Sequence, residues 1–178
     1  MRADATRNIQ AVLRAAARVF STDPLARITD VAAAAGVDRR TVYRRFDSRE
    51  DLLLAVYRAR LDELEALIDE TLVDRPVREA LPAFCERGIR LSRDWPVDVR
   101  AATDPAIRSR REELDARMDD FLRRAEREGV LAPGLPAGWS LRTLQTQLHT
   151  VAQEMPALEP AEAAALVVRT FLNGVGAV

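Results

Sequence analysis

The chain has 178 residues, of which 48% are hydrophobic, 31% charged and 5% aromatic, a composition that excludes an intrinsically disordered chain. No run approaches the ~20 apolar residues of a membrane span, and the single cysteine excludes an internal disulfide, so we expect a soluble cytoplasmic protein. The net charge of −1 combines +4 over residues 1–58 (11 Arg against 7 acids) with −5 over residues 59–178 (16 Arg against 21 acids), so the N-terminal part is the one suited to face phosphate.

Apolar residues recur with the 3.6-residue period of a helix along the chain, which predicts an all-α fold of about nine helices. The first helix carries an apolar stripe over residues 9–20 and ends before Pro24. Two short helices follow within residues 28–46, separated by a tight turn at Gly36. A long helix then runs over residues 48–72, which is long enough to leave one domain and enter another.

The next stripe covers residues 77–95 and predicts a helix that either kinks at Pro82 or begins there. A short helical piece is expected within residues 97–102. Pro105 then opens a helix that Gly129 closes.

The remaining sequence predicts two C-terminal helices, over residues 139–155 and 161–175, after a loop rich in Pro and Gly at residues 131–138. Both helices have apolar faces wider than one packing partner needs, which favours pairing with a second copy of the chain. We therefore predict two domains, over residues 1–47 and 48–178.

Residues 28–46 have the form of a helix-turn-helix. Gly36 suits the left-handed turn, Asp38 is the expected N-cap of the second helix, and the Thr29 hydroxyl can cap the first. The side chains expected to form a small core beneath the second helix are Val31, Val37, Val42 and Phe46.

The opposite face of that second helix is rich in arginine and suits the major groove of DNA. It carries Arg39, Arg40, Thr41, Tyr43 and Arg44. Spacing alone leaves a second interpretation open, namely that the arginines, with Arg45, form a solvated face balanced by Asp38, Asp47 and Asp51.

The first third of the chain resembles the DNA-binding region of the TetR family of bacterial transcriptional regulators. The residues that carry the resemblance are Ala16, Ala17, Phe20, Val31, Ala32, Ala35, Gly36, Val37, Asp38, Thr41, Val42, Tyr43, Phe46, Ser48 and Leu52. Three arginines depart from the family pattern. Arg27 replaces a Thr, Arg45 replaces the usual His and Arg49 replaces the usual Lys, all of which keep or add positive charge.

The resemblance implies a role for each polar side chain of this region. Phosphate contacts fix the register of a protein on DNA, whereas contacts with base edges supply specificity. The residues implied to hold phosphates are Arg27, Thr41, Tyr43 and Arg49, and those implied to reach bases are Arg39, Arg40, Thr29 and Arg44. For Arg45 a phosphate contact and mere exposure both stay open.

The resemblance further implies that residues 1–47 form a helix-turn-helix DNA-binding domain and residues 48–178 a ligand-binding and dimerisation domain. Such a homodimer, joined through the last two helices, would bind a pseudo-palindromic double-stranded DNA operator. We interpret the chain as a repressor that an unknown small-molecule effector releases from DNA. An activator, a regulator without an effector, and a helical protein-interaction module without DNA binding are the alternatives. The chain contains no recognisable catalytic constellation, so we do not expect an enzyme, and we expect no cofactor, metal or membrane partner.

Six side chains are candidates for contact with the effector, each beside a plainer alternative. Phe84, Trp95, Met118 and Phe121 would line an apolar cavity or simply form the core. Cys85 is a buried small hydrophobe or a redox-sensitive thiol. His149, the only histidine, is more readily explained by packing or an interface hydrogen bond than by a ligand contact.

Overall fold

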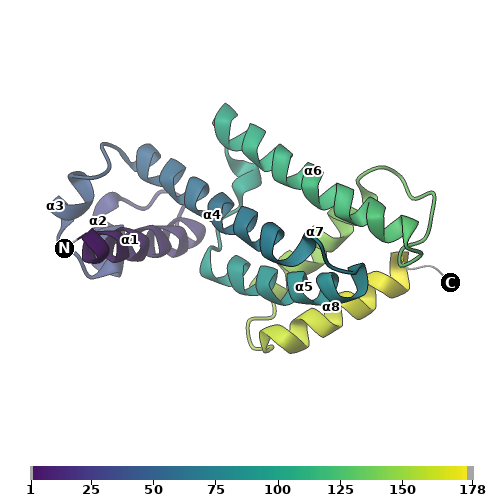
Figure 1. Cartoon of the computed structure of the whole chain (residues 1–178). Helices are drawn as coiled ribbons and strands as arrows, with labels where there is room; N and C mark the ends of the chain where they lie inside the picture. Colours follow the sequence, from purple (N-terminus) through teal and green to yellow (C-terminus); the bar gives the residue numbers. More distant parts are fainter. Residues whose placement is uncertain (1, 176–178) are drawn as a thin grey trace. The chain divides into compact units, whose positions relative to one another are not determined.

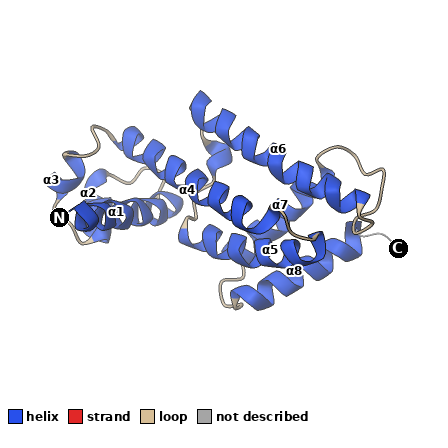
Figure 2. Ribbon diagram, viewed as in Figure 1, coloured by secondary structure: helices blue, strands red, loops and turns tan. Residues whose placement is uncertain are grey.

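The computed structural model describes residues 2–175, with the side chains of residues 8–174. These residues form eight α-helices and one 3₁₀-helix, and Figure 2 shows no β-strand among them. The prediction of an all-α fold with about nine helices is confirmed. Residue 1 and residues 176–178 of the predicted domains lie outside the described residues.

The chain divides into two compact units. Within the described residues, unit 1 comprises 2–62 and 94–109, and unit 2 comprises 63–93 and 110–175. Helix α4 (Arg49–Leu72) contributes its first part to unit 1 and its second part to unit 2. These units are defined by packing. The boundary between functional domains after residue 47 is defined by function, and it stays a prediction.

Unit 1 is built around α1 (Arg2–Thr22), α2 (Ile28–Ala35) and α3 (Arg39–Tyr43), which lie beside the first part of α4 in Figure 1. The apolar side chains of these helices meet in one small core. Its buried members include Val12, Leu13, Ala16, Phe20, Val31, Val42, Phe46, Leu52 and Val56.

The second stretch of unit 1 holds the 3₁₀-helix η1 (Val99–Ala101) and the buried ring of Trp95. The Arg14 guanidinium lies 5.5 Å from the centroid of that ring and pairs with the Asp94 carboxylate at 2.9 Å. These contacts fasten residues 94–95 to α1.

Unit 2 contains most of α5 (Val77–Asp94) and α6 (Pro105–Arg127), and all of α7 (Trp139–Gln153) and α8 (Pro160–Val175). Helices α7 and α8 pack against each other. The buried core of the unit includes Leu67, Ile68, Leu81, Phe84, Ile89, Leu114, Met118, Phe121, Leu144, Leu148, Val167 and Phe171.

Helix α5 begins at Val77 and continues through Pro82, so the alternative that it begins at Pro82 is wrong. Proline removes the hydrogen bond to the carbonyl four residues earlier, which belongs here to Arg78. Both residues are exposed, so water can satisfy that carbonyl and the helix tolerates the proline.

The helix caps follow the predictions except at α2. There the N-cap is Arg27, and the Asp30 carboxylate accepts its backbone N–H at 2.7 Å, whereas the Thr29 side chain is exposed. Asp30 performs the capping that we expected of Thr29, because the third helical position lets a carboxylate reach back to the N-cap. The Ser48 hydroxyl accepts the Asp51 backbone N–H at 3.0 Å and caps the start of α4.

Candidate DNA-binding surface

The turn between α2 and α3 has the geometry predicted from the sequence. Gly36 adopts φ 66° and ψ 29°, in the left-handed region that favours glycine. Its N–H donates to Ala33 at 3.1 Å and the Val37 N–H donates to Ala32 at 3.0 Å, which satisfies the last carbonyls of α2. The Asp38 carboxylate then accepts the Arg40 N–H at 2.7 Å and caps α3.

Helix α3 is held from beneath by apolar side chains. Val31, Val42 and Phe46 are 0%, 1% and 6% exposed. Val37 is only half-buried, so the prediction that it joins this core holds in part. Because one face of α3 is fixed to the core, its other face is presented outward in a defined orientation.

The outward face of α3 and the turn after it carry the arginines that the sequence singled out. Arg39, Arg40, Arg44 and Arg45 are all exposed, as is half of Tyr43, while Thr41 is half-buried. Within the part of the chain that the structure describes, none of these four guanidinium groups forms an ion pair with an acidic side chain. The four cations are therefore available to an external anion.

The remaining candidates lie at the starts of α2 and α4. Arg27 and Thr29 are exposed. Arg49 is half-buried, and its guanidinium contacts the turn between α1 and α2 and the ring of Phe20. These contacts were missed at the level of sequence, where the only signal for them was an Arg in place of the family's usual Lys.

The six candidate ligand residues are divided between the two units. Phe84, Cys85, Met118 and Phe121 are buried in unit 2, and Trp95 belongs to unit 1. Burial raises the pKa of the Cys85 thiol to about 12, so the thiol stays protonated and unreactive at neutral pH.

His149 is the exposed member of this candidate set. It lies on α7 and is accessible from solvent, unlike the buried residues of unit 2. An exposed imidazole on the predicted dimerisation helix fits the interface alternative better than a place in the core.

A pocket of about 280 Å³ in unit 2 lies where α6 meets the loop that precedes α7. Its wall combines charged side chains of α6 with apolar loop residues: Asp119, Leu122, Arg123, Glu126, Leu131, Ala132, Leu135, Pro136, Ala137, Gly138 and Ser140. None of the six candidate ligand residues lines it. The volume lies just below the range of ~300–1,000 Å³ that is typical of small-molecule sites.

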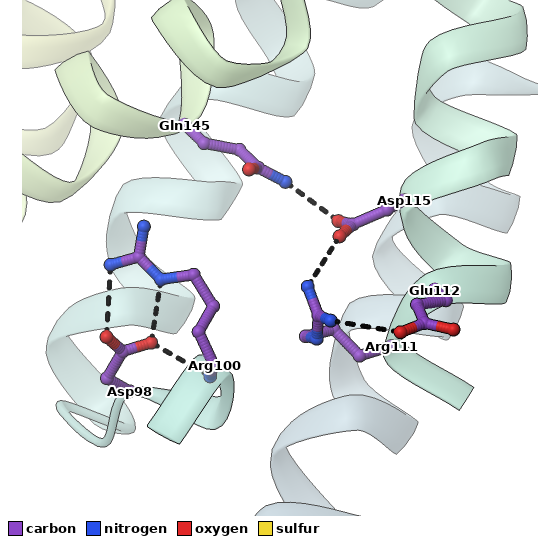
Figure 3. Close-up of polar contacts among 6 residues, drawn as sticks. All are labelled: Asp98, Arg100, Arg111, Glu112, Asp115 and Gln145. Atoms are coloured by element: carbon purple, nitrogen blue, oxygen red, sulfur yellow. Dashed lines mark hydrogen bonds and ion pairs between the residues drawn. The ribbon is translucent and has the colours of Figure 1, made fainter. Parts of the chain in front are cut away.

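A polar cluster joins α6 to α7 in unit 2. The Asp115 carboxylate accepts a hydrogen bond from the Gln145 amide at 2.8 Å and from Arg111 at 3.1 Å, as Figure 3 shows. These half-buried groups pair with each other, and we assign the cluster to a structural role. The Arg100 and Asp98 pair in the same figure belongs to unit 1, where the two Asp98 oxygens receive the guanidinium at 2.8 and 3.1 Å.

The described residues contain no group of three His, Cys, Asp or Glu side chains that could hold a metal ion. Among the same residues, no helix combines the length and the apolar character needed to span a membrane.

A short outward helix, fixed from beneath by apolar residues and preceded by a capped left-handed turn, defines a helix-turn-helix DNA-binding protein. Residues 12–56 match the family described as bacterial regulatory proteins, tetR family. The HTH-type transcriptional repressor LfrR of Mycolicibacterium smegmatis is 35% identical over 144 residues, which cover 76% of this chain and 72% of LfrR. The chain belongs to the TetR family, and it is a DNA-binding transcriptional regulator.

Solved structures agree along the whole chain. The crystal structure of LfrR from Mycobacterium smegmatis in complex with proflavine has a TM-score of 0.78 at 25% identity and covers 100% of both chains. The ketosteroid transcriptional regulator KstR2 of Mycobacterium tuberculosis has a TM-score of 0.76 at 20% identity over 94% of each chain, which shows the shared fold. These similar proteins are transcriptional regulators.

Proposed function

We propose that the protein is a homodimeric repressor that binds a pseudo-palindromic operator and is released by a small amphipathic molecule. The observation that carries the proposal is the exposed arginine face of α3, in a chain that is 35% identical to a named repressor. Guanidinium groups can bind guanine edges and phosphates bidentately, so this face suits both specific and non-specific contacts with DNA.

Direct contacts in this proposal come from exposed side chains and from the half-buried Thr41. Arg39, Arg40 and Arg44 would reach base edges together with Thr29, while Arg27, Thr41 and Tyr43 would hold phosphates. Arg45 is exposed beside them and would add charge. A set of this size predicts a steep linear fall of log affinity with log salt concentration.

The dimer would form through α7 and α8. One stripe of α8 that unit 2 leaves exposed or half-buried is apolar, with Ala165, Val168 and Leu172. Two copies related by a two-fold axis would place two DNA-binding domains on one operator, and the half-sites would mirror that symmetry.

Dimerisation is tested by Leu172→Glu, which places a charge on the half-buried apolar face of α8. We expect a monomer by sedimentation velocity and a large loss of operator affinity. Val73→Glu is the matched control, because Val73 is a 45% exposed apolar residue after α4, outside both helices. If the L172E variant were still dimeric, the proposal that α8 forms the dimer interface would be contradicted.

Effector release is supported by the structural likeness to LfrR, which was crystallised with proflavine. A small molecule bound in unit 2 would change the position of α4, which continues into unit 1. A typical allosteric coupling of about 1 to 3 kcal/mol corresponds to a 5- to 150-fold change in operator affinity.

The experiment begins with footprinting on the DNA that flanks the protein's own gene. Proflavine is then titrated against the protein alone and against the protein–operator complex. Because planar aromatic cations also insert between base pairs, an unrelated helix-turn-helix protein on its own operator is the control. Release specific to this protein supports the proposal, whereas proflavine that binds the protein without changing its DNA affinity contradicts release by this class of molecule.

A further inference from the structure

Arg49 is held by its own chain at the start of α4. Its Nε donates to the Ala26 carbonyl at 3.0 Å, and its Nη2 donates to the Pro24 carbonyl. The guanidinium carbon lies 4.7 Å from the centroid of the Phe20 ring, and Nη1 lies 3.7 Å from the Glu50 carboxylate. One side chain therefore connects α4 to the end of α1 and to the turn before α2.

These contacts need the chemistry of arginine. A guanidinium is a planar fork that can donate in two directions while its face stacks on an aromatic ring. A lysine ammonium is a point charge that can neutralise a phosphate but cannot reproduce this combination. The Arg49 side chain is 27% exposed, and the ring of Phe20 beneath it is buried, so the contacts are partly shielded from water.

The turn that Arg49 grips has further hydrogen bonds of its own. The Asp23 carboxylate accepts the Leu25 N–H at 2.9 Å, and the Asp23 carbonyl accepts the Ala26 N–H at 3.1 Å. The carbonyls of Pro24 and Ala26 then point to Arg49. The turn leads directly to Arg27, the N-cap of α2. Fixing it fixes where α2 begins relative to α4.

We propose that Arg49 is a positioning residue for DNA recognition, and not a phosphate contact. Its guanidinium holds the turn at residues 24–26 against the first turn of α4, so that α2 and α3 keep one orientation on the helix that carries them. This inference rests on DNA binding by the family and does not depend on the proposed effector.

The two roles predict different DNA-binding behaviour. Removing a phosphate-binding side chain weakens binding to all sequences about equally and lowers the slope of log affinity against log salt by about 0.9 for each phosphate that is no longer neutralised. Removing a positioning side chain weakens only the specific complex, in which the orientation of the recognition helix matters. It leaves non-specific binding and the salt slope unchanged.

The experiment compares Arg49→Lys, Arg49→Gln and the wild type on a 24-base-pair duplex selected in vitro and on a scrambled duplex, from 50 to 300 mM KCl. We expect both variants to bind the selected duplex roughly tenfold more weakly, as loss of charge-assisted hydrogen bonds implies. We expect unchanged affinity for the scrambled duplex and an unchanged salt slope. Arg27→Gln is the control, since its exposed guanidinium lies beside the same turn.

Three outcomes would overturn the proposal: wild-type affinity in R49K, a lower salt slope in R49Q, or equal weakening on both duplexes. Phe20→Leu provides a second test in case the Arg49 variants fail to fold. It keeps an apolar side chain in the core and removes the aromatic ring that lies under Arg49. We expect the same loss on the selected duplex alone from F20L. Hydrogen exchange at residues 23–27 should accelerate in R49K while exchange in α7 stays unchanged.

Discussion

Phe46 supports α3 from beneath, and its removal should lower the stability of unit 1. The side chain is 6% exposed. A buried phenylalanine covers about 150–250 Å² of surface, and at ~25 cal/mol per Å² this burial is worth roughly 4 to 6 kcal/mol as an upper bound. Phe46→Ala should therefore cost about 3 to 5 kcal/mol, the range usual for such substitutions.

The two tryptophans of the chain make this destabilisation measurable in unit 1. Trp95 is buried in unit 1, whereas Trp139 is 52% exposed on α7 in unit 2. In a Trp139→Phe background, urea unfolding followed by fluorescence reports unit 1 through Trp95. We expect the F46A variant to shift the urea midpoint sharply down and to lose DNA binding.

Tyr43→Ala is the matched comparison, because Tyr43 is an aromatic residue three positions earlier and is 49% exposed. It should change the free energy of unfolding by less than about 1 kcal/mol and still weaken DNA binding. Equal destabilisation by Y43A and F46A, or an F46A variant as stable as the wild type, would refute the division of α3 into a packed face and a reading face.

Three further predictions concern caps, turns and the buried thiol. Asp38→Ala should lower the stability of unit 1 by about 1 kcal/mol, and D38S should lower it by less, because serine is also a good N-cap residue. Equal destabilisation of D38A and D38S in urea unfolding would count against the capping role. Gly36→Val should destabilise the protein by at least ~1 kcal/mol and G36N by less. The cost is conformational, because φ at Gly36 is 66° and no neighbouring atom lies within 4 Å of an added Cβ. Equal melting temperatures for G36V and the wild type would exclude this conformational cost. Burial raises the pKa of the Cys85 thiol from 9.0 to about 12. The contribution of the buried thiol to the free energy of unfolding is therefore complete below pH 9. It is lost as the pH rises toward 12, by up to about 1.4 kcal/mol per pH unit. Cys85→Ala should flatten this alkaline loss in urea titrations, and an unchanged slope would contradict it.

The sequence was sufficient wherever local patterns decide structure. The 3.6-residue stripes located the helices, and Gly36 and Asp38 identified the turn and the cap before α3, because each acts on backbone groups within a few residues. The buried positions of Val42 and Phe46 followed from the same period.

Contacts between distant residues could not be predicted in this way. Arg49 reaches carbonyls 23 and 25 residues earlier, and Arg14 pairs with Asp94 across 80 residues. No periodicity encodes such pairs, since nothing in the sequence near either arginine indicates the distant partner that the fold brings to it. The same limit explains Trp95, which belongs to an apolar stripe in sequence but packs in unit 1.

The charge asymmetry along the chain also has a structural meaning. The arginines of α3 and the turn after it form no ion pairs among the described residues, whereas several arginines of unit 2 do. In unit 2, Arg110 pairs with Glu65 at 2.7 Å and Arg123 with Asp119 at 2.9 Å. Positive charge is left uncompensated on the surface that we propose for DNA binding.

DNA binding by the double variant Arg39→Ala/Arg40→Ala tests the central claim most directly. The measurement is the affinity for a duplex selected in vitro with the wild-type protein, with circular dichroism as the check that the helices remain. Both side chains are exposed at the start of α3, so we expect the fold to persist and specific binding to fall by at least ~100-fold, since each good base contact contributes roughly 1 to 3 kcal/mol. Wild-type affinity in the folded double variant would contradict the claim that α3 reads DNA.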